Sequence, residues 1–563
     1  MSDFFTSRRF VRLTESIIYK VLGGYADSLN DGPSFVDASA YDSSYFYSGS
    51  SVFRKTASKK AKWHLGYAVS DLTPYNFNEK EYFLGGYLTP DNGFNNKIQN
   101  IIDKMQCRII ALDDNSGNGT SFFATIDSIG TGNADIKIIR RRFNDLMKYK
   151  HPDAKIASVN VFSTHAHSCV DTQGLWTDTL SKVLHNRKKN KKGKGTYLSG
   201  ADSEFMNALA TKVAYGLLAA YENMTAGTMT LAQKDIGPEY INNKNRKSAT
   251  SLITILTRLV FTPDDESIKP TIIATIGAHP DVAGLPTSDG HGTGRELCGE
   301  YIYYMGETVN KAGYNFMFFN GAICAIYMSC GASDDGVYLA HRYEKSVRFG
   351  RELGKITLAL TKTSDEIKAD SLLYDEDIIN KERAESESNG YKYTLWCDNW
   401  SPVKEKTVKP ILNIRLKEVK LSVTNPLIQL VGKLNLVSYK VLREKDSTYS
   451  IVTEIGYMEI GKDLSIVLVP GEFCADLLNG GESLKAEGSF NNTDFPYPPL
   501  TEIFNKNLIA FGLANDAIGY IVPDNDYVLG EFNNHYHELI GLGKNTGSTI
   551  IKAFMELQKE LEI

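Results

Sequence analysis

Long apolar runs separated by turn-rich stretches restrict this chain to folds with deeply buried strands. The clearest runs are SLITILTRLVF, TIIATIGAH, NFMFFNGAICAIYM and LSIVLVPGE. Continuous apolar strands bounded by turns are typical of sheets that are covered on both faces. Residues 204–223 instead repeat apolar side chains with a helical period. We therefore expect the α/β class, with a mixed β-sheet core flanked by helices.

The length of 563 residues exceeds that of most compact domains. We predict one large domain over residues 61–563, with an insertion at about 380–450. Residues 1–60 are expected to form an amphipathic arm and a linker. Apolar positions fall on one face of the arm helix, and we expect that face to pack on the body of the protein, with shallow membrane docking as the alternative. These positions are Phe10, Leu13, Ile17 and Val21.

Composition excludes several classes of protein. Apolar residues make up 42% and charged residues 23% of the chain, which is typical of globular proteins and not of disordered, fibrous or polytopic membrane chains. The formal charge of −5 gives no reason to expect a nucleic-acid partner. The basic run RKKNKKGK (residues 187–194) is expected to be a solvated loop, with anionic lipid or nucleic acid as the alternative ligand.

The cysteine pattern and the first residues bear on the compartment. Seven cysteines without a CxxC pair argue against a disulfide scaffold and a cysteine-ligated metal. The N-terminal segment carries no uninterrupted apolar stretch of signal-peptide length. A cytoplasmic location is expected, with secretion after removal of a leader as the alternative. The oligomeric state is left open.

Two histidines follow one of the apolar strands. His165 and His167 are two residues apart, so both imidazoles point to the same side if the strand continues. Imidazole is a common zinc ligand, although such a pair is more often an ordinary polar strand end. A second pair near the C-terminus, His535 and His537, is expected to lie on the surface or behind a site.

Three further polar residues stand at the ends of apolar strands. His279 precedes a proline that stops strand pairing, and it is either a core histidine or part of a site. Glu472 follows a Pro-Gly break, where a buried carboxylate needs a partner or a metal. Tyr520 closes a similar strand and turn, where it is a core residue or a ligand.

The order of these motifs resembles the catalytic domain of the neutral/alkaline (non-lysosomal) ceramidases. The resemblance covers roughly residues 62 to 563, and the C-terminal immunoglobulin-like domain of many members is expected to be absent. It rests on short motifs in the family's order, namely SDLTP, LGGY, THAHS, the pair Asn245-Arg246, GAHP followed by SD, PGEF and LANDxxGY.

The resemblance implies a zinc ion and a set of site residues. The family's zinc ligands fall on His165, His279, Glu472 and Tyr520. The catalytic positions implied beside the scissile amide are His167 and Arg246, and Asp289 matches an aspartate that we expect to be structural. The expected substrate is a small amphiphilic N-acyl compound, which implies a role in lipid and sphingolipid metabolism, and peripheral membrane contact remains open.

One motif departs from the family pattern. The family carries a nucleophilic serine in G-D-x-S-P, whereas the equivalent stretch here is FFNGAICAIYMSCG. Ungapped alignment puts Ala325 at the aspartate and Tyr327 at the serine, and Ser329 matches only with two inserted residues. Ser329 therefore stays a candidate catalytic residue, while the altered motif favours attack by water without a covalent acyl-enzyme.

Three functions compete at this point. The first is a zinc-dependent hydrolase of linear amides that releases a fatty acid and an amine from a ceramide-like substrate. The second is a catalytically silent relative that binds a lipid or an amide in the same cleft. The third is a cysteine hydrolase that uses Cys169, next to the first histidine pair; a small buried thiol is the more common role of such a residue.

Overall fold

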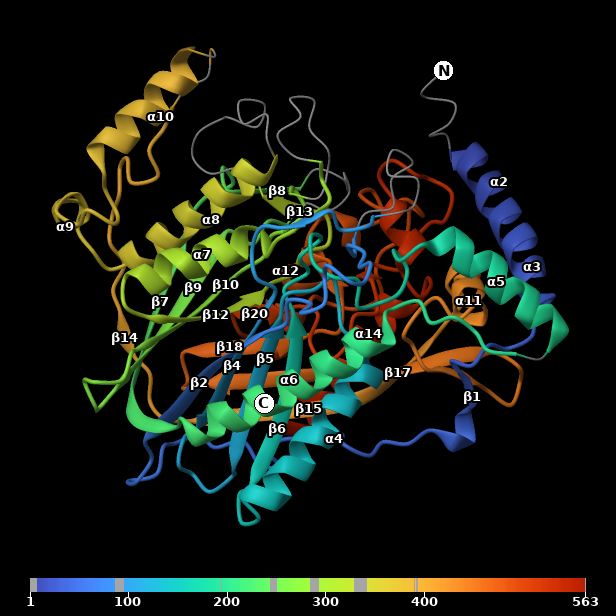
Figure 1. Cartoon of the computed structure of the whole chain (residues 1–563), viewed down its shortest axis with the longest axis horizontal. Coiled ribbons are helices and arrows are strands. Elements are labelled where there is room, and N and C mark those ends of the chain that lie inside the picture. The colour runs from blue at the N-terminus through green and yellow to red at the C-terminus, as the bar shows by residue number, and fades with distance from the viewer. Residues whose placement is uncertain are drawn as a thin grey trace.

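Two stacked β-sheets with helices on their outer faces make up the molecule, as Figure 1 shows. The computed structural model describes residues 8–86, 96–193, 195–243, 251–283, 293–328, 342–388, 390 and 393–561. Apolar side chains from both sheets interdigitate between them, and further apolar clusters join each sheet to its helices. This architecture confirms the predicted α/β class with a mixed sheet core.

The larger sheet has the strand order β12-β10-β9-β7-β2-β4-β5-β6, with β14 paired to β7. Neighbours are antiparallel except for the parallel pairs β5–β6 and β10–β12. Three of the apolar runs predicted from the sequence form neighbouring strands at one end of this sheet, and the fourth, LSIVLVPGE, contributes a strand to the smaller sheet. The strands are β2 (Trp63–Asp71), β4 (Gln106–Asp113), β5 (Thr120–Ile126), β6 (Ile156–Ser163), β7 (Thr225–Asp235), β9 (Ile255–Pro263), β10 (Thr271–Ile276), β12 (Asn315–Asn320) and β14 (Lys406–Thr407).

The smaller sheet has the order β1-β16-β17-β18-β20, and β15 also pairs with β17. The segment predicted as an insertion supplies two of these strands, and the predicted arm and linker supply another. The division of the chain into domains stays a prediction. The strands are β1 (Phe35–Asp37), β15 (Leu412–Ser422), β16 (Val441–Arg443), β17 (Tyr449–Ile460), β18 (Leu464–Leu468) and β20 (Leu508–Phe511).

Three short strand pairs lie outside the two large sheets. They connect loops that follow the long strands, and the last of them carries two of the predicted metal ligands. The pairs are β3 (Asn100–Ile101) with β11 (Glu296–Leu297), β8 (Ile241–Asn243) with β13 (Ile326–Met328), and β19 (Glu472–Phe473) with β21 (Tyr520–Ile521).

Helices pack on the outer faces of both sheets. The larger sheet is covered by α4 (Asn133–Lys150), α6 (Ser203–Glu222), α7 (Glu300–Lys311) and α8 (Arg342–Ala359), and the smaller one by α12 (Ala475–Asn479), α13 (Leu500–Phe504) and α14 (Thr546–Leu561). The remaining helical segments are α2 (Arg8–Ile18), η1 (Tyr19–Gly23), α3 (Gly24–Asp27), η2 (Ala38–Ala40), α5 (Thr179–Lys192), α9 (Ser364–Lys368), α10 (Glu376–Ser388), α11 (Pro426–Lys433), η4 (Glu482–Leu484) and η5 (Tyr536–Ile540). Within the described ranges, no helix has both the length and the apolar character to cross a bilayer.

The N-terminal helix packs through a different face from the one predicted. Val11 is fully buried, whereas Leu13, Ile17 and Val21 are 59%, 51% and 60% exposed. A polar contact also joins the buried face of the helix to the body of the protein. The Glu15 carboxylate accepts a hydrogen bond from the backbone N–H of Leu529. The prediction that the apolar stripe faces the body is therefore wrong.

The basic run also differs from its prediction. Residues up to Lys192 belong to the helix α5, not to a loop, and the helix ends at Gly193, which adopts a left-handed conformation (φ 63°). Lysines in the last turn interact favourably with the carbonyl end of the helix dipole, which explains why so basic a segment can be helical.

Candidate metal centre

The ends of four strands converge at one end of the sheet sandwich. His165 lies just after β6, His279 just after β10, Glu472 after β18, and Tyr520 follows β20. The backbone joins these ends across the two sheets, because Asn515 N–H donates to the carbonyl of Val161. Strands far apart in the sequence thus bring their polar end residues into one place.

Asn320 at the end of β12 ties the two histidine-bearing segments together. Its side-chain amide donates hydrogen bonds to the carbonyl oxygens of Thr164 and Ala278, at 2.9 and 3.1 Å. Each acceptor immediately precedes one of the histidines. Asn320 is 1% exposed, so no solvent competes for these bonds. The sequence does not predict this role, because an asparagine at the end of a strand does not by itself indicate which segments it will join.

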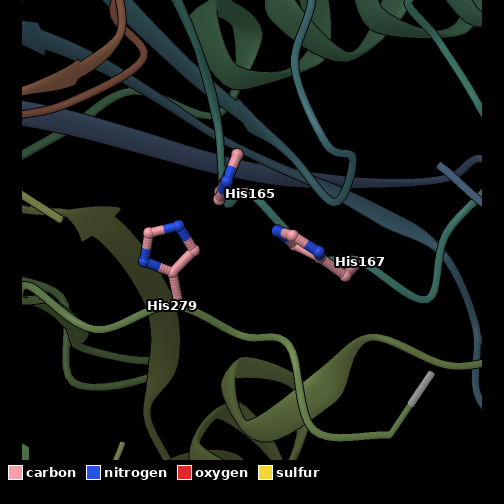
Figure 2. Close-up of side chains that lie close together, drawn as sticks. All are labelled: His165, His167 and His279. Atoms are coloured by element: carbon pink, nitrogen blue, oxygen red, sulfur yellow. The ribbon is translucent and has the colours of Figure 1, made fainter. Parts of the chain in front are cut away.

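Three imidazole rings surround one buried space, as Figure 2 shows. The ring centroid of His165 lies 4.7 Å from that of His167 and 4.9 Å from that of His279. One nitrogen of each ring lies within 4.8 Å of one nitrogen of both others, and all three residues are buried. His165 has a positive φ of 67°, a conformation that is unusual outside glycine and that turns the chain sharply after the strand.

The hydrogen bonds of two rings fix which nitrogen faces the centre. His165 Nδ1 lies 2.7 Å from the carbonyl oxygen of Ile129, and His279 Nδ1 lies 2.9 Å from that of Ile326. A carbonyl oxygen can only accept, so each Nδ1 carries a proton and each ring turns its Nε2 atom toward the centre. This is the arrangement by which backbone carbonyls orient metal-binding histidines.

Both Nε2 atoms point at the same carboxylate oxygen. Glu472 Oε2 lies 3.3 Å from Nε2 of His165 and 3.0 Å from Nε2 of His279. Two lone pairs and a carboxylate oxygen repel one another at this distance unless a proton or a cation lies between them. A tetrahedral zinc with bonds of about 2.0–2.1 Å separates its ligand atoms by roughly 3.3 Å, so the spacing fits such an ion.

Glu472 and Tyr520 are held side by side by backbone pairing. The parallel strands β19 and β21 place Glu472 directly opposite Tyr520. Both residues line a cavity of about 50 Å³ together with His165 and His167. The structure therefore brings together His165, His279, Glu472 and Tyr520, the four residues predicted as ligands, and adds His167 to the group that could hold a metal.

Burial and mutual charge set the protonation of the site. Burial alone would raise the pKa of Glu472, but the two imidazoles beside it lower the pKa well below its usual range. Burial lowers the pKa of His167 well below its ordinary value, and the neighbouring His165 and His279 lower it further. Burial, followed by the Glu472 charge, raises the pKa of Tyr520. An ionised carboxylate therefore faces a neutral His167 and a neutral phenol.

Gly86 allows His167 to sit where it does. A Cβ atom at position 86 would lie 2.6 Å from Cγ of His167, and the glycine has a φ of 122°. Only a glycine fits this conformation and this contact without a shift of the ring. Gly86 of the LGGY motif thus has a physical role next to the candidate site.

Other predicted site residues lie outside the described part of the chain. Arg246, Asp289 and Ser329 fall there, so their places in the site stay predictions. The aligned serine position holds Tyr327, whose ring stacks on His279 with centroids 4.9 Å apart. The hydroxyl groups of Tyr327 and Tyr536 form a hydrogen bond with each other. A tyrosine thus packs on one of the candidate ligands at the position to which ungapped alignment assigns the family's serine.

The structure decides between the two expectations for the second histidine pair, which were a place on the surface and a place behind the site. His535 and His537 are 7% and 0% exposed, so neither lies on the surface. The ring of His537 contacts that of Tyr520 at a centroid distance of 4.7 Å. His537 therefore supports a candidate ligand from behind, while His535 faces Glu538.

The structure also weakens the cysteine alternative. Cys169 is completely buried, and burial raises the pKa of its thiol well above the ordinary value. The reactive form of a cysteine is the thiolate, which this environment disfavours. The thiol lies 3.4 Å from the carbonyl oxygen of Cys298, to which it donates, as expected of a structural cysteine.

Comparisons with known proteins agree at the level of the fold. No protein-family model matches the sequence, and no curated protein matches it. Among solved structures, the chain is similar to the neutral ceramidase from Pseudomonas aeruginosa, with a TM-score of 0.53 and 11% identity over 88% of this chain and 75% of that one. A second structure, described as a ceramidase complexed with C2, gives a TM-score of 0.55 and 12% identity over 89% and 75%. At such low identity these matches show that the chain has the ceramidase fold.

Proposed function

We propose that the protein is a zinc-dependent amidohydrolase that cleaves a ceramide-like N-acyl amide to a free fatty acid and an amine. The observation that carries this proposal is the convergence of two imidazole Nε2 atoms and one carboxylate oxygen on a single buried point. The fold shared with solved ceramidases supports the choice of substrate class. In the proposal His165, His279, Glu472 and Tyr520 hold the metal.

The chemistry follows from this set of residues. A zinc ion in the site would polarise the acyl carbonyl and lower the pKa of a bound water. His167 is neutral and adjacent to the ligands, so it can take a proton from the attacking water and return one to the leaving amine. Arg246 is assigned to the charge that develops on the acyl oxygen.

The test of the proposal is hydrolysis of a panel of N-acyl substrates by purified protein. Ceramides of several acyl lengths, N-acyl ethanolamines and N-acyl amino acids are incubated with the zinc-loaded protein, and released fatty acid is measured by mass spectrometry. We expect release from at least one class, loss after chelation and recovery with zinc. Release that survives chelation would refute the zinc mechanism.

Side-chain variants separate the two proposed routes of attack. Because Tyr327 stands at the serine position, we expect Ser329→Ala to keep most of its activity. His167→Ala and Glu472→Ala should each lose at least about a hundredfold, the usual effect of removing a general base or a metal ligand. An acyl group trapped on Ser329 would show that the serine route is the right one.

The catalytically silent alternative predicts a different pattern. The altered motif around Tyr327 is the observation that favours it, because ungapped alignment puts a tyrosine at the position of the family's nucleophile. Such a protein would bind zinc and retain an N-acyl lipid without releasing fatty acid from any substrate of the panel.

A further inference from the structure

One edge of the molecule combines exposed apolar and basic side chains on two helices. On α5, Leu180 and Leu184 are 66% and 58% exposed. They are four residues apart and therefore lie on one face of the helix. The opposite face is buried through Asn186 and Asn190, so the leucines point away from the body.

Basic residues continue the same face of α5. Arg187, Lys188 and Lys191 are exposed, and they follow Leu184 at helical spacing. The outward face thus changes along its length from apolar to basic. Exposed leucines followed by cations are typical of helices that lie in the interface of a membrane.

The N-terminal helix adds a second apolar stripe at this edge. Leu13, Ile17 and Val21 are exposed and four residues apart. The helix continues into α3, which contacts α5 where Arg187 lies over the ring of Tyr25 at 5.5 Å. Figure 1 shows α2, α3 and α5 at the same side of the molecule.

The chain connects this edge to the candidate metal centre through a short segment. Trp176 lines the cavity that the ligands share, and α5 begins three residues later. From these observations we propose that α2 and α5 dock on a membrane surface that carries anionic lipids. The apolar side chains would enter the headgroup region, and the arginine and lysines would bind lipid phosphates or carboxylates.

The proposal is tested by sedimentation of the full chain with vesicles of phosphatidylcholine alone or with a third phosphatidylserine. We expect binding to the anionic vesicles that falls as salt rises. Lys188→Glu and Lys191→Glu should each weaken it about fivefold or more, the effect of one basic residue at such a surface. The double change Leu180→Ser with Leu184→Ser should weaken binding to both vesicle types.

Control variants change equally exposed residues elsewhere. Ile378→Ser on α10, which is 51% exposed, and Lys148→Glu on α4 should bind vesicles as the wild type does. Wild-type affinity in the α5 variants, or no vesicle binding by the wild type, would overturn the proposal. Binding of RNA instead of vesicles through the same lysines would also overturn it. Cleavage of a short, water-soluble N-acyl substrate should be unchanged in all variants, so failure here is separable from failure of the proposed function.

A separate observation concerns Trp176, inside the cavity. The indole N–H groups of Trp63 and Trp400 donate to the backbone carbonyls of Val408 and Lys362. The N–H of Trp176 is buried and has no acceptor among the described residues, and Trp176 is 4% exposed. A buried donor without an acceptor costs free energy and is usually satisfied by a ligand or water.

The loop that carries Trp176 is fixed by a buried carboxylate. Asp171 accepts hydrogen bonds from the backbone N–H groups of Gln173, Gly174 and Trp176. The backbone that carries the indole is thus held in place, and Trp176 lines the same cavity as His165, His167 and Tyr520. Resting on the proposed function, we infer that the Trp176 N–H donates a hydrogen bond to an acyl oxygen of the substrate or of the fatty-acid product.

Nuclear magnetic resonance of protein labelled with ¹⁵N-tryptophan tests this inference. The indole peak assigned through Trp176→Phe should move downfield when octanoate is added to the zinc-loaded protein. The peak of Trp396 should stay in place, because its indole N–H is also buried without an acceptor among the described residues but lines a different cavity. Trp176→Phe should lower kcat/KM at least about fivefold, and Trp396→Phe should not.

The outcomes distinguish failure of the Trp176 inference from failure of the proposed function. If the wild type holds zinc and hydrolyses amides while the Trp176 peak and the Trp176→Phe kinetics do not change, the inference about Trp176 alone is wrong. If the peak moves with octanoate but no amide is hydrolysed, Trp176 binds an acyl oxygen and the proposed function is wrong.

Discussion

At the scale of single residues, Gly86 controls the position of His167. Gly86→Ala would combine an unfavourable φ with a Cβ atom 2.6 Å from the ring. We expect a loss of about a hundredfold in hydrolysis, because the proposed proton-transfer group moves by a fraction of an ångström or more. Gly117→Ala is the control, because its φ of 83° carries the same strain while no atom lies within 4 Å. Equal losses of activity in both variants would contradict this role.

Glu300 gives a prediction for pH dependence. Glu300 is fully buried and accepts hydrogen bonds from the hydroxyls of Ser168 and Ser346. Burial raises the pKa of its carboxyl group to about 7. The pKa of Glu300 is higher in the folded state than in the unfolded state, where it is about 4.3, so the folded state holds the proton more tightly. The stabilisation that this proton provides is therefore complete below about pH 4.3 and is lost as pH rises through about 7. Between pH 5 and 7.5 the wild type should therefore lose about 2 kcal/mol more unfolding free energy than Glu300→Gln. Denaturant titrations at the two pH values measure this difference, and parallel changes in both proteins would contradict the assignment.

At the scale of elements, the sequence did not predict through which face the N-terminal helix packs on the body of the protein. Val11→Ala should cost about 1–2 kcal/mol of unfolding free energy because the side chain is fully buried. Leu13→Ala on the same helix should cost less than about 0.5 kcal/mol because it is 59% exposed. Thermal or denaturant unfolding of the pair decides between the faces. The reverse order of the two losses would restore the face predicted from the sequence.

Strands were more predictable than helix faces for a physical reason. The run TIIATI is buried on both sides of a central strand and gives the β10 strand without ambiguity. The arm helix has apolar and polar residues on each side, and only tertiary contacts such as that of Glu15 with Leu529 decide which side packs. The basic run of α5 was misassigned because local charge does not show that Val183 and Asn190 anchor the other face.

The residues of the candidate site also divide into those that could be predicted from the sequence and those that could not. His165, His279 and Glu472 could be predicted because each polar residue ends an apolar strand, where its burial needs a partner. Asn320 and Trp176 could not, because their roles depend on contacts between segments far apart in the sequence.

At the scale of the whole molecule, the ceramidase fold and the convergent donors lead to one central claim, a single zinc per chain. The measurement is the metal content of purified protein after dialysis, for the wild type and for His279→Ala, Glu472→Ala and the exterior control His151→Ala. We predict about one zinc per chain in the wild type and in His151→Ala, and almost none in the other two. A wild type without bound metal, or full zinc content in His279→Ala, would contradict the account.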